Sequence, residues 1–152
     1  MNSEKKKSRY TRIIKQIKEL LTRSENKRAR MATITAVLHH KMDYFFWTGF
    51  YLLDEQNNLV VSNYQGPVAC MELKKNVGVC WEAVNKKETI VVEDVAAFPG
   101  HIACDSRSKS EIVVPLKNYK GEVIGVLDVD SKDLNSFDQV DRHALEAIIA
   151  LI

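Results

Sequence analysis

Apolar positions in the amino-terminal part of the chain follow helical spacing. They recur every three or four residues, which is the period of an amphipathic helix. One set comprises Ile13, Ile14, Ile17, Leu20 and Leu21, and a second comprises Met31, Ile34, Val37, Leu38 and Met42. The polar stretch Ser24–Asn26 separates the two sets. The pattern therefore predicts two helices, with the second ending at about Lys41.

From Tyr44 the pattern changes to short runs rich in aromatic and β-branched residues, which are typical of strands. YFFWTGFYLL and LVVSNY flank the polar DEQNN, and EIVVPL and EVIGVLDVD flank KNYKG. We expect two antiparallel hairpins. Trp47 and Tyr51 are four residues apart in the first run, so they share a face, as a core ladder or as one wall of a pocket.

The segment between the hairpins and the end of the chain contain further elements. GVCWEAVNKKE fits a short helix, TIVVED a strand, and VAAFPGHIACDSRSKS a long connection of the kind that is usually functional. Val140, Ala144, Ile148 and Leu151 return to helical spacing, and Ser136 with Gln139 resembles a capping box. These elements predict an α+β layered fold, a mostly antiparallel sheet flanked by helices.

The length and composition fit one globular domain. The chain has 152 residues, of which 45% are hydrophobic and 28% charged. We expect helices in residues 1–42, the sheet and its long connecting loops in 44–131, and a closing helix in 136–152. No apolar run approaches the roughly 18 residues of a membrane helix, and the first residues lack the apolar core of a signal peptide. These features favour a cytoplasmic protein without a membrane partner.

Basic residues are concentrated at the amino-terminal end. Residues 1–30 carry eleven Lys or Arg against three Glu, a net charge of +8, and the remainder of the chain carries −6. Only Tyr10 interleaves the basic residues with an aromatic ring, and no recognised nucleic-acid motif is present. A solvated helix face is therefore favoured over nucleic-acid binding.

The chain has three cysteines, Cys70, Cys80 and Cys104, an odd number that argues against a structural disulfide framework. They are free, metal-bound or redox-active, and buried inert thiols stay open as an alternative. A zinc site formed with His101 has only one close spacing, from His101 to Cys104, and the chain has no Cys-x-x-Cys pair. Asp105, next to Cys104, opposes ionisation of that thiol.

Two carboxylates stand at the end of the strand pattern 123–130. Because side chains alternate along a strand, Asp128 and Asp130 share the face of Ile124 and Val126. The opposite face is apolar too, so we expect both faces to be covered and the carboxylates to meet a cavity, a cap or a cation. The competing interpretation is a turn that only ends the strand. No calcium-loop pattern supports a hard cation.

Several of these motifs occur together in one known family. WTGFYLL, YQGPVAC, GVCWEAV, FPGHIACDSRSKSEIVVPL and IGVLDVDS resemble the free methionine-(R)-sulfoxide reductases, which are single-domain enzymes with the GAF fold. The resemblance runs from about Phe45 to Asp141, and the block from Phe98 to Leu116 is its most specific part. It implies an antiparallel sheet of about six strands and a homodimer.

The resemblance also implies a role for each thiol. Cys104 matches the catalytic cysteine, which would attack the sulfoxide and become a sulfenic acid. Cys70 and Cys80 match the cysteines that regenerate it through a disulfide recycled by thioredoxin, with a slight preference for Cys70 as the first resolving thiol. Trp81 and the stretch KKNVG depart from the family pattern, which leaves the local geometry of Cys80 open.

The remaining site residues follow from the same resemblance. Glu111, Asp128 and Asp130 match the substrate-binding carboxylates of the family, and Trp47 and Tyr51 match its aromatic pocket wall. Crowding three carboxylates in one cavity raises the pKa of at least one, which leaves a proton donor for the sulfoxide oxygen. Another carboxylate would pair with the ammonium group of the free amino acid. No cofactor or metal is implied.

GAF domains also act as small-molecule sensors, so a non-catalytic ligand-binding module is the competing interpretation. Sensor modules usually adjoin an output domain, and one domain takes up almost the whole of these 152 residues. Three thiols match the enzyme motifs. The sequence therefore favours the reductase.

Overall fold

A computed structural model describes residues 1–101 and 104–152. Its centre is a six-stranded antiparallel sheet in the order β3-β2-β1-β6-β5-β4. The strands are β1 Trp47–Leu53, β2 Leu59–Gln65, β3 Glu72–Leu73, β4 Ile90–Val92, β5 Ser110–Lys117 and β6 Val123–Ser131. The α+β class and the expected number of strands are confirmed, and both predicted hairpins are present.

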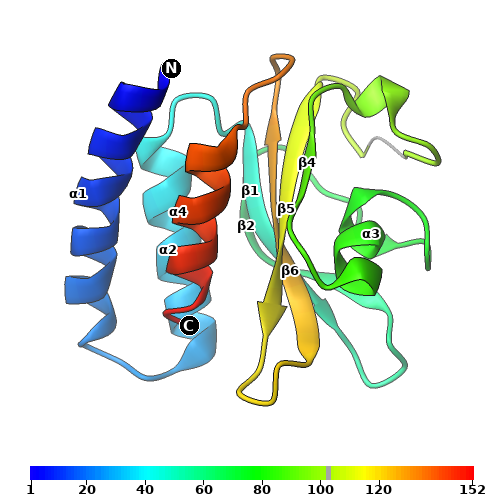
Figure 1. Ribbon diagram of the computed structural model, residues 1–152. Helices are drawn as coiled ribbons and strands as arrows, with labels where there is room; N and C mark the ends of the chain where they lie inside the picture. Colours follow the sequence, from blue (N-terminus) through cyan, green and yellow to red (C-terminus); the bar gives the residue numbers. More distant parts are fainter. Residues whose placement is uncertain (102–103) are drawn as a thin grey trace.

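Helices cover both faces of the sheet (Figure 1). The helices α1 (Ser3–Leu21), α2 (Lys27–Lys41) and α4 (Gln139–Ile149) form a three-helix layer on one face, in which α2 and α4 lie against the strands and α1 packs on them from outside. The short helix α3 (Val79–Lys86) and the 3-10 turn η1 (Val95–Ala97) lie on the other. The polar break between the first two helices lies where the sequence predicts it, and α2 ends at Lys41 as expected.

The central strands bury apolar side chains on both faces. Phe50 and Leu127 pack against the three-helix layer, whereas Tyr51, Val113 and Val126 belong to a second core under α3. All five are at most 3% exposed. The prediction that β6 is covered on both faces is confirmed, and it explains why this strand reads as a nearly continuous apolar run.

One detail of that strand prediction is wrong. Val126 shares the face of Asp128, as expected, but Ile124 packs against the opposite core, on the side of the three helices. The register between β5 and β6 shifts between Leu116 and Lys117, which breaks the alternation of side chains at this end of the strand.

The start of α4 also differs from the prediction. The N-cap is Asp138, whose side chain accepts from the backbone N–H groups of Val140 and Asp141, and Asp141 completes the capping box. The predicted cap, Ser136, donates instead to Ser131 Oγ at 2.7 Å. Asp caps a helix as well as Ser does, so spacing alone could not choose between the two sites. The helix ends at Ile149 rather than at the end of the chain.

A buried charge cluster joins α1 to α4. Lys6 Nζ lies 2.6 Å from Asp141 Oδ2, and these residues are 3% and 0% exposed. The hydroxyl groups of Tyr10 and Tyr44 both donate to Asp141 Oδ1. A buried ion pair is stable only when its remaining polar atoms are also hydrogen-bonded, and these contacts meet that requirement.

The Tyr10 contact predicts a measurable loss of stability. Tyr10→Phe removes a hydroxyl that lies 2.7 Å from a buried carboxylate, and we expect the free energy of unfolding to fall by about 1.5–3 kcal/mol. Urea unfolding measures the change. Tyr119→Phe is the matched control, because Tyr119 is 91% exposed. An equal change in the two variants would contradict the role assigned to Tyr10.

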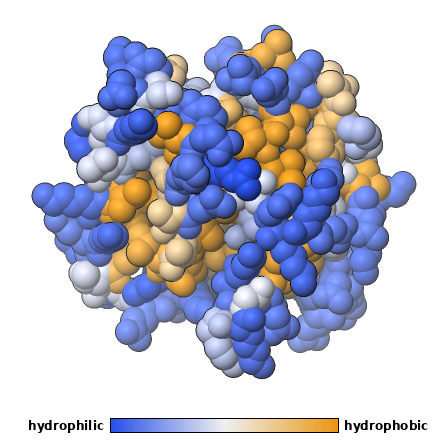
Figure 2. Space-filling view, viewed as in Figure 1, coloured by the Kyte–Doolittle hydropathy of each residue, from blue (hydrophilic) through white to orange (hydrophobic). Residues whose placement is uncertain are grey.

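Charged and polar side chains cover much of the visible surface, with hydrophobic areas between them (Figure 2). On α1, Lys5, Lys7, Arg12 and Lys15 are exposed, which agrees with a solvated face, whereas Lys6 is buried. None of the helices in the described part of the chain combines the length and hydropathy that a membrane span requires.

Candidate active site

A cavity of about 240 Å³ lies between the sheet, α3 and the loops around residues 68–78, 101 and 104–108. The eight candidate residues named in the sequence analysis all line this cavity, although they come from distant parts of the chain. They are Trp47, Tyr51, Cys70, Cys80, Cys104, Glu111, Asp128 and Asp130.

The central strands supply the carboxylates. Glu111 on β5 pairs with Asp130 on β6, and cross-strand partners project from the same face of a sheet. Asp128 lies two residues before Asp130 on that face. Glu111 and Asp128 are 5% and 7% exposed. Three acidic groups therefore share one wall of the cavity, where Glu111 and Asp128 are buried and Asp130 is half-buried.

This environment opposes ionisation of the three acids. Burial raises the pKa of Glu111, and the charges of Asp128 and Asp130 raise it further. Burial and the charge of Asp130 likewise raise the pKa of Asp128, and burial raises the pKa of Asp130 to about 6. No ion pair among the described residues includes any of them. The wall therefore favours protonated carboxyl groups, or a cation that neutralises their charge.

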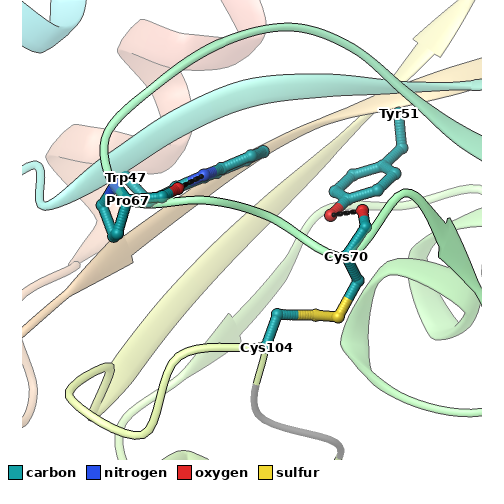
Figure 3. The surroundings of a disulfide bond; sticks show 5 residues. All are labelled: Trp47, Tyr51, Pro67, Cys70 and Cys104. Carbon is teal, nitrogen blue, oxygen red and sulfur yellow. Dashed lines mark hydrogen bonds between the residues drawn. A yellow bond between two sulfur atoms is a disulfide. The ribbon is translucent and has the colours of Figure 1, made fainter.

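Two of the three cysteines form a disulfide at this cavity (Figure 3). Cys70 lies in the loop between β2 and β3, and Cys104 lies in the loop before β5. They are 34 residues apart, and their Cα atoms are 5.5 Å apart. Two neighbouring loops thus hold a pair of sulfur atoms close enough to exchange between thiols and a disulfide.

The aromatic wall supports the loop that carries Cys70. Tyr51 OH donates to the carbonyl oxygen of Cys70 at 2.9 Å, and Trp47 Nε1 donates to that of Pro67 at 3.1 Å (Figure 3). Both rings are buried and lie stacked, with centroids 5.8 Å apart. Trp47 and Tyr51 therefore share a face, as predicted, and they position the loop as well as lining the cavity.

A third aromatic ring packs against this wall without lining the cavity, and the sequence analysis did not identify it. Tyr64 on β2 stacks on Trp47 with centroids 5.2 Å apart. Gly49 permits the close approach, because a Cβ at that position would lie 2.6 Å from Trp47 Cη2 and would also clash with Tyr64. The glycine within WTGF was the available signal, since glycine inside a strand often marks a close approach.

The surroundings of Cys104 are less negative than the sequence suggests. Arg107 binds the carboxylate of Asp105 through two nitrogens, at 2.7 and 3.0 Å, and hydrogen bonding to Arg107 lowers the pKa of Asp105 to about 2. Arg107 also lies over the ring of Phe46, 4.9 Å from its centroid. An arginine therefore partly offsets the charge beside Cys104.

Cys80 lies apart from the disulfide, at the start of α3. Its thiol is free and 6% exposed, and burial raises its pKa, with further contributions from the charges of Asp128 and Glu111. The neighbouring Trp81 packs into the core, and its indole donates to the carbonyl oxygen of Leu73. Cys80 therefore faces the cavity although Trp81 departs from the family pattern.

The fold and the residues of the cavity define a GAF domain. The GAF domain family model matches residues 32–152, and the protein is a member of this class. It is 50% identical over 148 residues to GAF domain-containing protein A of Dictyostelium discoideum, covering 97% of this chain and 92% of that one.

Two further relatives narrow the assignment. The chain is 42% identical over 122 residues to the free methionine-R-sulfoxide reductase of Escherichia coli, covering 80% of this chain and 73% of the relative. A crystal structure of free methionine-R-sulfoxide reductase from Neisseria meningitidis in complex with its substrate superimposes with a TM-score of 0.89 and 42% identity, covering 93% and 84% of the two chains. The chain belongs to the free methionine-R-sulfoxide reductase family.

Proposed function

We propose that this protein reduces free L-methionine-(R)-sulfoxide to L-methionine. The observation that carries the proposal is the Cys70–Cys104 disulfide at the edge of a cavity with three buried carboxylates. Reduction of a sulfoxide needs a nucleophile for the sulfur and a proton donor for the oxygen. Family membership supports the same reaction, because the relatives named for it carry the same fold.

In the proposed reaction, the Sγ atom of Cys104 attacks the sulfoxide sulfur, and a protonated carboxyl of the cavity donates to the sulfoxide oxygen. The oxygen is transferred to Cys104, which becomes a sulfenic acid, and methionine leaves. The thiol of Cys70 then displaces water from the sulfenic acid and forms the disulfide. The raised pKa of each of the three carboxyl groups supports the donor role.

The same wall suits a free amino acid. A carboxylate among Glu111, Asp128 and Asp130 would pair with the ammonium group of the substrate, which a methionine within a peptide lacks. The stacked rings of Trp47 and Tyr51 offer an apolar surface for the methyl group. Selectivity for the free amino acid would follow from an ion pair with a buried carboxylate.

The return to the reduced state completes the proposal. A dithiol of the thioredoxin type attacks the Cys70–Cys104 disulfide, becomes oxidised and leaves two thiols behind. Cys80 lines the same cavity and would serve as the second regenerating thiol, after Cys70. We also infer a homodimer from the family resemblance, and size-exclusion chromatography with light scattering tests this oligomeric state.

A coupled assay tests the reaction and its substrate together. NADPH oxidation is followed with thioredoxin and thioredoxin reductase, offering free L-methionine-(R)-sulfoxide, the free (S) epimer and a peptide-bound sulfoxide in parallel. We expect turnover of the free (R) epimer alone. No turnover of any of the three, together with no methionine produced in dithiothreitol, would refute the reductase.

Thiol counting separates the reductase from a sensor that only binds its ligand. The reduced protein is treated with one equivalent of substrate without any reductant, and its free thiols are then alkylated and counted. The enzyme loses two thiols for each methionine formed, because Cys104 and Cys70 become a disulfide. Thiols that stay unchanged while the ligand is bound would favour the sensor.

A further inference from the structure

Cys80 lies close to two of the buried carboxylates that line the cavity. The Sγ atom of Cys80 and one carboxylate oxygen each from Glu111 and Asp128 all lie within 4.8 Å of one another. The three side chains come from α3, β5 and β6. Each is at least nine-tenths buried, at 6%, 5% and 7% exposure. One helix and two strands thus bring three potential metal ligands close together.

An unpartnered oxygen atom gives a second, independent indication of a ligand. Asp128 Oδ1 is buried and has no hydrogen-bond partner among residues 1–101 and 104–152. Buried polar atoms in native proteins nearly always have a partner, and an orphan requires an explanation such as an ion or a ligand. The nearby Cys80 takes no part in the disulfide, so its sulfur atom stays available as a ligand in the oxidised protein.

The ligand set indicates the kind of cation. A thiolate is a soft ligand and a carboxylate a hard one, and zinc accepts both, whereas magnesium and calcium take oxygen ligands. Ligand atoms on a tetrahedral zinc lie roughly 3.4–3.6 Å apart, given its usual bond lengths. Side chains within 4.8 Å of one another would therefore close on the ion by movements of about 1 Å.

We propose that Cys80, Glu111 and Asp128 form a binding site for a borderline-soft divalent cation of the zinc type. The charges favour this occupant, because no described cationic side chain forms an ion pair with Glu111 or Asp128. The cation would occupy carboxylates assigned above to the substrate. Bound metal and bound sulfoxide would therefore exclude each other, and a chelator would reverse the inhibition.

Metal binding is measured on the oxidised protein, where Cys80 is the only free thiol of the chain. Cadmium is the probe, because its bond to a thiolate gives an ultraviolet charge-transfer band, and calorimetry with zinc gives the stoichiometry. We expect one ion per chain and a band that is absent in Cys80→Ala. Asp128→Asn should weaken binding by at least about 10-fold. Glu72→Gln, a pocket-lining carboxylate outside the triad, should bind as the wild type does.

Two results would overturn the site. One is the absence of stoichiometric binding by the oxidised wild type, and the other is unchanged calorimetric binding in both Cys80→Ala and Asp128→Asn. Circular dichroism confirms that each variant is folded. These measurements need no substrate, so their outcome is independent of the reductase activity.

Only the predicted competition with methionine sulfoxide rests on the proposed function. Zinc inhibition that becomes stronger as the substrate concentration falls would support this competition.

Discussion

Cys104→Ser lowers the turnover of free methionine-(R)-sulfoxide by at least about 10³-fold, the expected scale for loss of a catalytic nucleophile. A serine hydroxyl neither attacks the sulfoxide sulfur efficiently nor accepts its oxygen. Cys70 also loses its partner, because Cys104 supplies the other half of the disulfide. The variant should therefore show no steady-state turnover, and it should form no methionine in a single-turnover experiment.

The measurement for Cys104→Ser uses both thioredoxin and dithiothreitol as reductants, so that a defect in recycling is distinguished from a defect in chemistry. Cys70→Ser provides the contrast, since it should still form one methionine per chain in a single turnover. Ser106→Ala is the control for changes in the loop, because Ser106 is exposed and does not line the cavity. Retained steady-state activity in Cys104→Ser would refute its assignment as the nucleophile.

Glu111→Gln lowers kcat/KM by about 10²–10⁴-fold, the range expected when an acid-base group is removed. Glutamine matches the carboxyl group in size but cannot transfer a proton to the sulfoxide oxygen or pair as an anion with the substrate ammonium. Burial and two neighbouring aspartates oppose the charge of Glu111, so the native residue carries an electrostatic cost that the amide lacks.

A loss of activity in Glu111→Gln could reflect a defect in the reaction or a defect in folding. Thermal stability separates these two explanations. Removing an acid from a crowded, buried cluster relieves repulsion, and the midpoint of thermal unfolding should stay unchanged or rise. Glu122→Gln is the control, since Glu122 is exposed in the turn between β5 and β6. A lower Tm together with full activity of the remaining folded protein would show that Glu111 acts in folding rather than in the reaction.

The fold was predictable from the sequence wherever a period runs long enough to be read. The helices and the strands of both hairpins follow repeats of 3.6 or 2 residues. β3, which consists of only Glu72 and Leu73, is too short to show a period. The N-cap of α4 was predicted wrongly because Ser136 and Asp138 both suit that position. The side chain of Ser136 is hydrogen-bonded to Ser131, and Asp138 caps the helix.

The site was predictable as a set of residues but not as an arrangement. Linear motifs identify the side chains that line the cavity, whereas the joining of Cys70 to Cys104 depends on the distance between two loops. The burial of Lys6 was hidden in the same way, because its neighbours in the basic run are exposed. Its partner, Asp141, lies 135 residues further along the chain. Such contacts leave no periodic signal.

The sheet supplies the acids of the cavity, and the loops supply its reactive sulfur pair. Glu111 and Asp128 stand on central strands that share an extended ladder, whereas Cys70 and Cys104 belong to connections outside the sheet. Evolution can therefore change the two parts separately. A chain without the two loop cysteines would keep the acidic wall of the cavity but would have no sulfur pair for redox chemistry.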